Sequence, residues 1–480
     1  MKRAPPRPGS WQAGDDGAGA VPSTEARARR NGRRRVPHEQ RHALTMVAGR
    51  TFQGSGHLLL REPVIRSLLD TDFYKLLMLQ MIWRFKPSTH VTFAVINRSP
   101  DIRLASAISE NDLVRELDHA RSLRFQTDEL TWLATSQFYG KTGLFDPGFL
   151  HDLASFALPP YELSSRDGEF VLRFPGLWRE TTLWEIPALI ILSELFARAE
   201  VKGLGESQLD ALYDCAHAKL WGKIGRLKAL AREGSLAISD FGTRRRHSFW
   251  WQRWCIEALR EGLQQSFVGT SNVNFARELG VEAIGTNAHE LPMVYAALAN
   301  SAVELRQAPF KVLEDWAKLY DGDLRVLLPD TFGSTHFLAA APEFADSWAG
   351  ARVDSMPPVE GAEELIAWWK KRGLDPKEKR VVLSDAMTVE SIETSARHLR
   401  GKVMVSIGWG TNLTNDFSGC WPNGFEGKAK LPSIVCKAVE ADGRPAIKLS
   451  DNPHKFIGSP EEIARYEQIF DYRRGEARPA

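Results

Sequence analysis

A repeating pattern of apolar and polar segments begins at Leu236 and limits the folds that this chain can adopt. From there to Asn412, short apolar runs alternate with helical stretches, and each apolar run ends in a polar cluster. Seven such units follow one another: LAISDFGTRRR, FVGTSN, EAIGTNAHE, LRVLLPDTFGS, ARVDS, RVVLSDAMT and VMVSIGWGTN. Strands that alternate with helices form parallel sheets, whose carboxyl ends share one edge. This repeating pattern therefore predicts a parallel α/β barrel with its ligand site at the carboxyl ends of the strands.

A doubly wound open sheet is the alternative architecture for the same repeating pattern. Such a sheet would need polar strand ends only near its switch point, whereas this chain has a polar cluster after every apolar run. We therefore favour an irregular (β/α) barrel over residues 201–431.

The remainder of the globular sequence predicts a smaller α+β domain. Residues 67–85 have the apolar spacing of a helix, and residues 91–97 and 169–174 are typical of strands. Near the C-terminus, Asp442-Gly443 between two apolar runs indicates a hairpin, and residues 460–470 indicate a helix. We expect this tail to pair with the N-terminal region, so that the domain is discontinuous: residues 57–200 plus 432–480.

The bulk composition excludes several classes of protein. The 480 residues carry a formal net charge of only +2, and residues 1–56, where basic residues outnumber acidic ones, are expected to be a disordered extension rather than a nucleic-acid-binding element. The longest apolar run, residues 186–192, is too short for a membrane span and predicts a buried helix. Four widely spaced cysteines indicate neither a zinc site nor a disulfide framework. A cytoplasmic protein without a membrane or nucleic-acid partner fits best.

The polar clusters at the strand ends have the composition of an anion site. Glycine lets backbone N–H groups approach phosphate oxygens, threonine and serine add hydroxyl donors, and arginine offers a charged fork. Within DFGTRRR we select Arg244 as the inward arginine. His289, with Glu290 beside it, is a candidate to exchange a proton or a phosphoryl group. VSIGWGTN, which ends in Thr411 and Asn412, is typical of a phosphate cradle.

These residues carry a resemblance. TDFYKLLM, DFGTRRR, GTSN, GTNAHE, RVDS, VVLSD and SIGWGTN, in this order, are similar to the motifs of nicotinate phosphoribosyltransferases over roughly residues 60–465. The resemblance implies an irregular barrel of the type II phosphoribosyltransferase kind joined to a smaller α+β domain. It also implies a homodimer with shared active sites, in which Tyr74 of the TDxYK motif reaches the partner's site.

The resemblance also implies roles for individual residues. His289 matches the histidine that the family phosphorylates with ATP. The implied nicotinate-binding residues are Tyr74, Phe241, Ser271, Thr286 and Arg352. The implied ligands of 5-phosphoribosyl 1-pyrophosphate are Arg244, Asp354, Ser384, Asp385, Gly408, Gly410 and Thr411. Mg²⁺ is the implied metal, and its protein ligands stay open.

Two positions bear on specificity. Relatives that use nicotinamide carry an acid at the position of Ser271, and a neutral serine suits a carboxylate, which an acid would repel. The common family form DSGD is Asp354-Ser355-Met356-Pro357 here, so the second acid is missing. Any role of that acid with Mg²⁺ or pyrophosphate is in question for this chain.

The function expected from these observations is transfer of phosphoribose to nicotinate, giving nicotinate mononucleotide and pyrophosphate, with ATP hydrolysis coupled through His289. Two alternatives stay open at this point: a nicotinamide phosphoribosyltransferase, and a different barrel enzyme acting on a sugar phosphate. The second would need a lysine or carboxylate base at a strand end, and no convincing lysine stands there.

Overall fold

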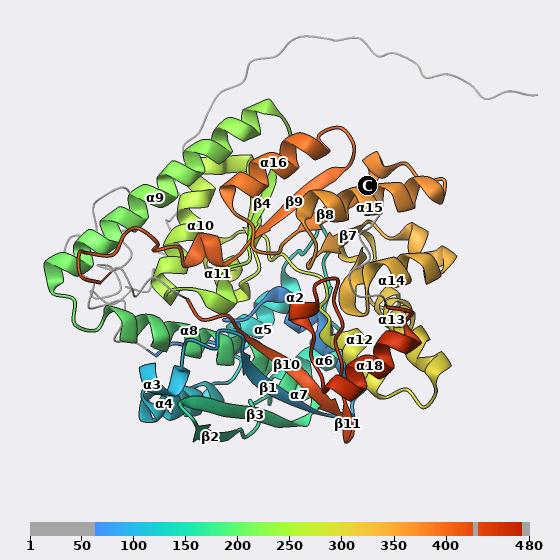
Figure 1. Cartoon of the computed structure of the whole chain (residues 1–480), viewed down its shortest axis with the longest axis horizontal. Coiled ribbons are helices and arrows are strands. Elements are labelled where there is room, and N and C mark those ends of the chain that lie inside the picture. The colour runs from blue at the N-terminus through green and yellow to red at the C-terminus, as the bar shows by residue number, and fades with distance from the viewer. Residues whose placement is uncertain (1–62, 426–430, 473–480) are drawn as a thin grey trace, which may run out of the picture. The chain divides into compact units, whose positions relative to one another are not determined.

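The computed structural model describes residues 63–425 and 431–472. The predicted basic extension, residues 1–56, lies outside the described residues and is not tested. The six strands of the predicted barrel region are β4 (Ala237–Asp240), β5 (Phe267–Thr270), β6 (Val326–Leu327), β7 (Gly350–Val353), β8 (Arg380–Leu383) and β9 (Met404–Trp409). They form one parallel sheet in the order β5-β4-β9-β8-β7-β6 (Figure 1).

The strand order identifies a barrel-like sheet rather than a doubly wound one. The first strand of the series, β4, pairs with the last, β9, in register from Ala237 with Ser406 to Asp240 with Trp409. The two edges of the sheet, β5 and β6, are consecutive strands, and they also approach each other. Ala283 pairs with β5 through a single bridge, and Asn287 Nδ2, four residues later, donates to the Val326 carbonyl of β6 at 3.0 Å. A side chain thus spans the gap in the ladder.

The expected strand at EAIGTNAHE is wrong in detail, because only the isolated bridge between Thr270 and Ala283 forms there. The cause lies at Gly285. Its N–H donates to the Tyr139 hydroxyl at 2.8 Å, and the same hydroxyl donates to the Gly285 carbonyl at 3.1 Å. A tyrosine therefore satisfies backbone groups that a neighbouring strand would otherwise take, and the described residues show no closed backbone ladder at this position.

The second sheet is antiparallel and combines both ends of the chain. Its strands are β1 (His90–Asn97), β2 (Glu162–Arg166), β3 (Glu169–Leu177), β10 (Ile434–Ala441) and β11 (Arg444–Pro445), in the order β11-β10-β1-β3-β2. The pairing of the tail with the N-terminal region is observed, because β10 runs along β1 from Val91 with Ala441 to Asn97 with Ile434 (Figure 1). The hairpin at Asp442 and Gly443 is also confirmed, with φ of 45° and 75°. The boundaries of the two predicted domains stay a prediction.

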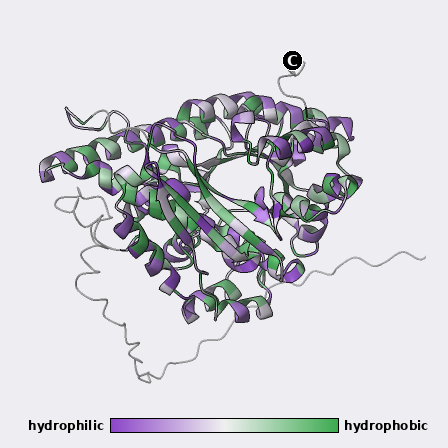
Figure 2. Cartoon of the chain, turned by 60° about the horizontal axis from the view of Figure 1, so that its bottom comes forward, coloured by the Kyte–Doolittle hydropathy of each residue, from purple (hydrophilic) through white to green (hydrophobic). Residues whose placement is uncertain are grey.

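Helices cover these sheets. They are α2 (Phe73–Phe85), α3 (Leu104–Ala107), α4 (Glu110–Ser122), α5 (Thr127–Thr135), α6 (Pro147–Leu153), α7 (Trp178–Thr181), α8 (Glu185–Val201), α9 (Glu206–Glu233), α10 (Phe249–Leu263), α11 (Val273–Leu279), α12 (Glu290–Ala297), α13 (Ala302–Ala317), α14 (Ser334–Ala340), α15 (Pro358–Lys371), α16 (Val389–Leu399), α17 (Thr411–Thr414) and α18 (Pro460–Ile469). Figure 2 shows both hydrophilic and hydrophobic residues along these helices. In α16, for example, Val389, Ile392 and Leu399 are buried, at the spacing of one helical face.

Two helix predictions have different outcomes. The buried helix expected at residues 186–192 is confirmed as part of α8. The helix expected from Ser67 begins only at Phe73, and Asp72 stands at its N-cap without a side-chain capping bond. The reason is tertiary: the Asp70 carboxylate pairs with Arg246, and the Asp72 carboxylate accepts from Ser271. Among the described residues, no helix is both long enough and apolar enough to span a bilayer.

Candidate active site

A cavity of about 280 Å³ lies inside the parallel sheet, near the lower end of the range of ligand pockets. Its lining follows the period of two that places alternate strand residues on one face. The strand residues that line it in this pattern are Ala237 and Ser239 of β4, Arg380 and Val382 of β8, and Ser406 and Gly408 of β9. Of these residues, Ala237, Ser239, Ser406 and Gly408 are small, which leaves room in the interior of the barrel.

The cavity brings together seven of the thirteen residues expected at the site. These are Tyr74, Phe241, Arg244, Ser271, Thr286, Arg352 and Gly408. The other six do not line it: His289, Asp354, Ser384, Asp385, Gly410 and Thr411. Tyr74 and Phe241 both line this cavity of their own chain, and the role of Tyr74 in a partner's site, which the family resemblance implies, stays a prediction.

Two glycines allow close contacts with the Phe241 ring and with the backbone of Tyr74. A Cβ on Gly408 would lie 2.3 Å from Cδ2 of the Phe241 ring, so only glycine lets this ring pack on β9. A Cβ on Gly285 would lie 2.8 Å from the backbone nitrogen of Tyr74. The predicted role of Gly408 in a phosphate cradle is not tested, but its observed contact is with the Phe241 ring.

Arg244 lies among acids in the cavity. Its Nε is 3.4 Å from Asp72 Oδ2, its Nη1 is 4.0 Å from Glu185 Oε1, and its guanidinium is 6.0 Å from the centre of the Tyr74 ring. Its side chain stays 39% exposed, so the guanidinium can still reach a ligand. Of the neighbouring arginines, Arg246 is fully buried and pairs with Asp70 and Glu194, which makes it structural.

Asp72 is a cavity residue that the sequence reasoning missed as part of the site. The Ser271 hydroxyl donates to Asp72 Oδ1 at 2.7 Å, so the neutral serine has an acid directly behind it. Burial raises the pKa of Asp72 above its ordinary value, although Arg244 and the Ser271 hydroxyl oppose this shift. Asp72 belongs to the site because Ser271 donates a hydrogen bond to it, and the spacing of residues in the sequence could not reveal this contact.

His289 lies in a closed cluster beside the cavity. Its Nδ1 is 2.9 Å from Thr331 Oγ1, and its Nε2 is 2.9 Å from Asp354 Oδ2. Burial and the nearby Lys448 lower the pKa of His289 to about 4, so the imidazole is neutral near pH 7. Although burial opposes ionisation of Asp354, Arg352 and His289 hold its pKa well below the ordinary value.

These protonation states determine the tautomer of His289. An ionised Asp354 carboxylate can only accept hydrogen bonds, so Nε2 carries the ring proton and donates it. Nδ1 of the neutral ring then keeps a lone pair and accepts from the Thr331 hydroxyl. The ring nitrogen of His289 that keeps its lone pair is therefore Nδ1.

A lysine from the C-terminal tail ties the acids at the ends of β7 and β8. Lys455 Nζ donates to the Asp354 carbonyl at 2.9 Å and lies 2.7 Å from Asp385 Oδ2. The Ser384 hydroxyl donates to Asp354 Oδ1 at 2.9 Å. The cavity and this cluster meet at Arg352, which lines the cavity and reaches Asp354 Oδ2 at 3.7 Å.

One group of side chains fits a divalent cation. Ligand atoms of His289, Asp330 and Asp354 lie within 4.8 Å of one another. Asp330 Oδ1 is buried and has no hydrogen-bond partner among the described residues. Mg²⁺ prefers carboxylate oxygens and retains several waters, so Asp330 and Asp354 are the pair that fits it, with the imidazole left free.

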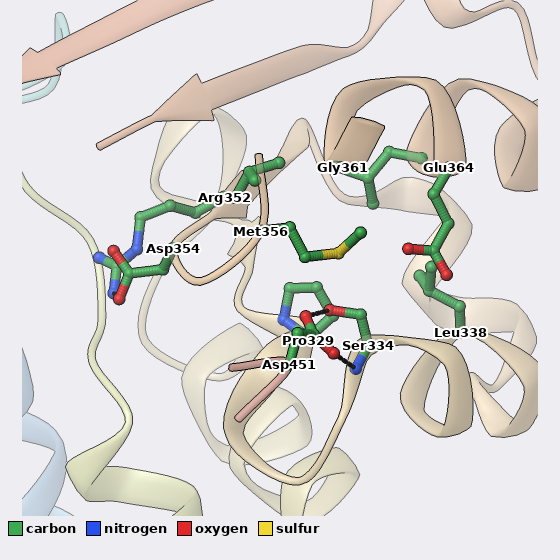
Figure 3. A pocket seen from close by; sticks show the side chains of 11 residues that line it. Pro329, Ser334, Leu338, Arg352, Asp354, Met356, Gly361, Glu364 and Asp451 are labelled. Carbon is green, nitrogen blue, oxygen red and sulfur yellow. Dashed lines mark hydrogen bonds and ion pairs between the residues drawn. The ribbon is translucent and has the colours of Figure 1, made fainter. Parts of the chain in front are cut away.

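Met356, which stands where the family form DSGD has glycine, lines a small pocket beside Asp354 (Figure 3), and Pro357 stands in place of the missing acid. The Met356 side chain points toward Ser334, Leu338 and Gly361, whereas the side chains of Arg352 and Asp354 lie on the opposite side. Ser334 is fixed by Asp451, whose carboxylate accepts from its N–H at 2.9 Å and its hydroxyl at 2.6 Å. Met356 therefore fills space in this pocket and does not extend the acidic group.

A buried ion network that the sequence did not predict connects the cavity to the His289 cluster. Lys75, which follows Tyr74, pairs with Glu185 at 2.6 Å and with Glu290, which follows His289. Glu290 also accepts from Trp178 Nε1 and from the Thr182 hydroxyl, each at 2.6 Å. All of these groups are buried.

Comparisons with known proteins agree with this geometry. Residues 69–193 match the family model of the nicotinate phosphoribosyltransferase N-terminal domain, and residues 236–474 match that of the nicotinate phosphoribosyltransferase family. Among solved structures, the chain is similar to nicotinate phosphoribosyltransferase from Vibrio cholerae, with 30% identity, a TM-score of 0.76, and coverage of 86% of this chain and 96% of that one.

The match to two further solved structures extends over the whole of their chains. The Porphyromonas gingivalis nicotinate phosphoribosyltransferase has 27% identity and a TM-score of 0.73 over 85% of this chain. A putative nicotinate phosphoribosyltransferase from Saccharomyces cerevisiae has 26% identity and a TM-score of 0.71 over 86%. With two family models in sequence order and a barrel site that gathers the expected rings and arginines, the chain belongs to the nicotinate phosphoribosyltransferase family and is an enzyme of that kind.

Proposed function

We propose that the enzyme transfers phosphoribose from 5-phosphoribosyl 1-pyrophosphate to nicotinate and couples this step to ATP hydrolysis through phosphorylation of His289. The observation that supports the transfer most directly is the cavity itself. Two aromatic side chains, Tyr74 and Phe241, and two arginines, Arg244 and Arg352, line one space inside the barrel. A flat, aromatic carboxylate suits such a lining.

In this proposal, the pyridine ring lies against Phe241 and Tyr74, and Arg352 pairs with the carboxylate of nicotinate. Arg352 Nε is buried and has no hydrogen-bond partner among the described residues, so it has capacity for an acceptor. Thr286 adds a hydroxyl to the same lining. Ser271 already donates to Asp72, so its expected contribution is to hold this acid away from the ligand rather than to bind nicotinate itself.

The phosphoribosyl donor would extend from the cavity toward the strand ends. Loss of pyrophosphate leaves positive charge on the anomeric carbon and negative charge on the leaving group. Arg244 would bind phosphate, Asp354, Ser384 and Asp385 would face the ribose, and Gly410 and Thr411 would receive the 5-phosphate. Mg²⁺, held by Asp330 and Asp354, would supply positive charge to the departing pyrophosphate. Aligning the pyridine nitrogen with the anomeric carbon is then the main task of the cavity.

The role of ATP depends on His289. The neutral ring offers Nδ1 as acceptor, so a bond forms between Nδ1 and the γ-phosphorus of ATP while the bond to ADP breaks. Asp354 holds Nε2 and stabilises the positive charge that the phosphorylated ring acquires. Nearly two negative charges arrive at Nδ1, where the Thr331 hydroxyl now lies, while Asp330 lies 3.7 Å from Nε2 of the same ring; this favours a rearrangement of the loop that carries both residues. A coupling of about 1–3 kcal/mol is typical of such linkage.

A homodimer with shared sites stays part of the proposal as an expectation from the family. Tyr74 lines the cavity of its own chain, and its reach into a partner's site is part of this expectation. Activity measured across a dilution series, alongside the molar mass in solution, would test for shared sites.

The coupling is tested with His289→Ala. We expect ATP consumption that depends on nicotinate to be abolished, while nicotinate still binds, because His289 does not line the cavity. His398→Ala is the matched control, since His398 is an exposed histidine that also pairs with a carboxylate, Glu363. Unchanged ATP consumption in His289→Ala would show that the phosphohistidine is wrong.

The substrate is tested by comparing nicotinate and nicotinamide at equal concentration. Arg352 should favour the carboxylate over the neutral amide, because a charged fork loses its partner when the carboxylate is replaced. Faster nucleotide formation with nicotinamide would overturn the assignment of nicotinate.

A further inference from the structure

Two cysteines that stand 205 residues apart in the chain meet in the structure. Cys215 lies on α9 and is exposed, and Cys420 is buried, with 7% of its surface accessible. Their Sγ atoms are 2.7 Å apart. The spacing of the cysteines in the sequence indicated no disulfide, so this pair is a product of the fold. The other two cysteines, Cys255 and Cys436, are buried and contact no sulfur in the described part of the chain.

The backbone around Cys420 is held against α9 by neighbouring contacts. Lys219 Nζ lies 2.7 Å from Asp416 Oδ1 and 2.7 Å from the Ser418 carbonyl. Lys223 Nζ reaches the Asn412 carbonyl at 2.7 Å. Cys215, Lys219 and Lys223 follow each other at intervals of four residues, so they share one face of α9. This face fixes residues 412–420, which we call the α9-bound segment.

The α9-bound segment also contacts two loops at the mouth of the barrel. Thr414 Oγ1 donates to the Gly242 carbonyl at 3.0 Å, and Asn415 Nδ2 donates to the Arg245 carbonyl at 2.9 Å. Asn412 Nδ2 donates to the Met387 carbonyl at 3.0 Å. A covalent bond at the Cys420 end would therefore constrain a segment that touches the loops after both β4 and β8.

We propose that Cys215 and Cys420 form a redox-active dithiol, which hydrogen peroxide oxidises to a disulfide that tethers the α9-bound segment to α9. The contact distance is already close to the length of an S–S bond, about 2.0 Å, so closure needs only a small movement. This inference does not depend on the proposed function.

The chemistry assigns different roles to the two thiols. The exposed Cys215 thiolate attacks a peroxide oxygen, the O–O bond breaks, and a sulfenic acid forms with release of water after protonation. The Cys420 sulfur then attacks the Cys215 sulfur, the S–S bond forms, and a second water leaves. In total, two thiols lose two electrons and two protons, and one peroxide is reduced to two waters.

The test is peptide mapping of the full-length protein, reduced, desalted, treated with hydrogen peroxide, alkylated and digested without reductant. We expect a linked peptide that joins residues 215 and 420, lighter by two hydrogens than the sum of its parts, and lost on treatment with dithiothreitol. Cys215→Ser, an exposed position that should tolerate the change, must abolish the linked peptide. The matched control Cys255→Ser must retain it. Conversion of Cys215 to the sulfinic acid without a cross-link, or linkage of Cys215 between two molecules, would overturn the proposal.

Hydrogen exchange tests the tether separately. Amides of residues 412–420 should exchange more slowly in the oxidised protein than in the reduced protein, and oxidant should leave their exchange unchanged in Cys215→Ser. Equal exchange rates in a sample that carries the cross-link would contradict the claim that the bond restrains the α9-bound segment.

Discussion

The cavity and the His289 cluster lie side by side, yet they differ in how far their polar groups are already satisfied. In the cavity, Arg244 is 39% exposed and Arg352 Nε lacks a partner. In the cluster, both ring nitrogens of His289 are hydrogen-bonded, and Asp354 accepts from His289 and Ser384. The cavity can receive a ligand as it stands, whereas His289 must first release Thr331. This difference suits one site that binds substrate and another that changes state.

A buried cation, Lys75, also joins the two regions. Lys75 lies one residue after Tyr74 and pairs with Glu290, one residue after His289. It pairs with Glu185 as well, and although burial opposes ionisation, Lys437 and Lys75 hold the pKa of Glu185 well below the ordinary value. A shift of α12 on phosphorylation of His289 would therefore move Glu290 and its partner Lys75, and so change the position of the adjacent residue, Tyr74.

The largest effect is expected from Lys75→Met, which breaks the connection between the two regions. It leaves the Glu290 carboxylate buried without its cation, whereas Glu185 keeps its pair with Lys437, and breaking a buried pair costs about 3–5 kcal/mol. Denaturant unfolding measures the loss. Lys311→Met, at an exposed pair with Glu314, is the control and should change the free energy of unfolding by less than about 1 kcal/mol. Equal effects at the two positions would show that Lys75 does not join the regions.

Arg352→Ala removes the side chain that lines the cavity and also contacts Asp354 of the His289 cluster. Removing a charge-assisted hydrogen bond to the ligand costs about 1.5–3 kcal/mol, so kcat/KM for nicotinate should fall roughly 10- to 100-fold. Steady-state kinetics with nicotinate and nicotinamide would show the loss for nicotinate alone. Arg465→Ala, at an exposed pair with Glu462, should leave both substrates unaffected. An equal loss for the two substrates would remove Arg352 from carboxylate recognition.

Gly408→Ala changes the cavity while leaving the His289 cluster intact. The new Cβ would displace the Phe241 ring, and overpacking of this kind costs about 1–3 kcal/mol, so kcat/KM for nicotinate should fall about tenfold or more. ATP hydrolysis without nicotinate should change little. Gly222→Ala is the control: it lies within α9 with open space around it, and it should stabilise the protein by about 0.5–1 kcal/mol. Unaltered nicotinate kinetics in Gly408→Ala would contradict the role of the ring.

A further effect is a pH dependence of stability that comes from the cluster. The pKa of His289 is about 4 in the folded protein and about 6.5 in the unfolded chain, so the unfolded chain binds an extra proton between these values. The free energy of unfolding should therefore fall as the pH is lowered from about 6.5 to 4, by at most about 1.4 kcal/mol per pH unit from this group. His289→Gln should reduce this slope. Half-buried His217 and buried His247 contribute with the same sign in both proteins, so only the difference is informative.

The sequence predicted the site best where the chemistry follows the strand ends. Parallel strands bring their carboxyl ends to one edge, which is why Phe241, Ser271 and Gly408 could be placed together from patterns alone. The α+β region was also predictable in part, since alternation revealed β1 and β3, and Asp442-Gly443 revealed the hairpin.

What the sequence could not show depends on contacts between distant residues. Ser271 has Asp72 behind it, Tyr139 replaces a strand at Gly285, and Cys215 meets Cys420, and none of these pairs leaves a local pattern. The start of α2 was misplaced for the same reason, because tertiary partners take the carboxylates of Asp70 and Asp72. The cavity placement of Tyr74 within its own chain likewise follows from packing rather than from spacing.

The most direct test of the central claim is nucleotide formation by the purified protein with nicotinate, 5-phosphoribosyl 1-pyrophosphate and Mg²⁺, measured with and without ATP. We expect nicotinate mononucleotide in both reactions, formed faster with ATP, and an ATP effect that disappears in His289→Ala. Absence of nucleotide from nicotinate in both reactions would contradict the account.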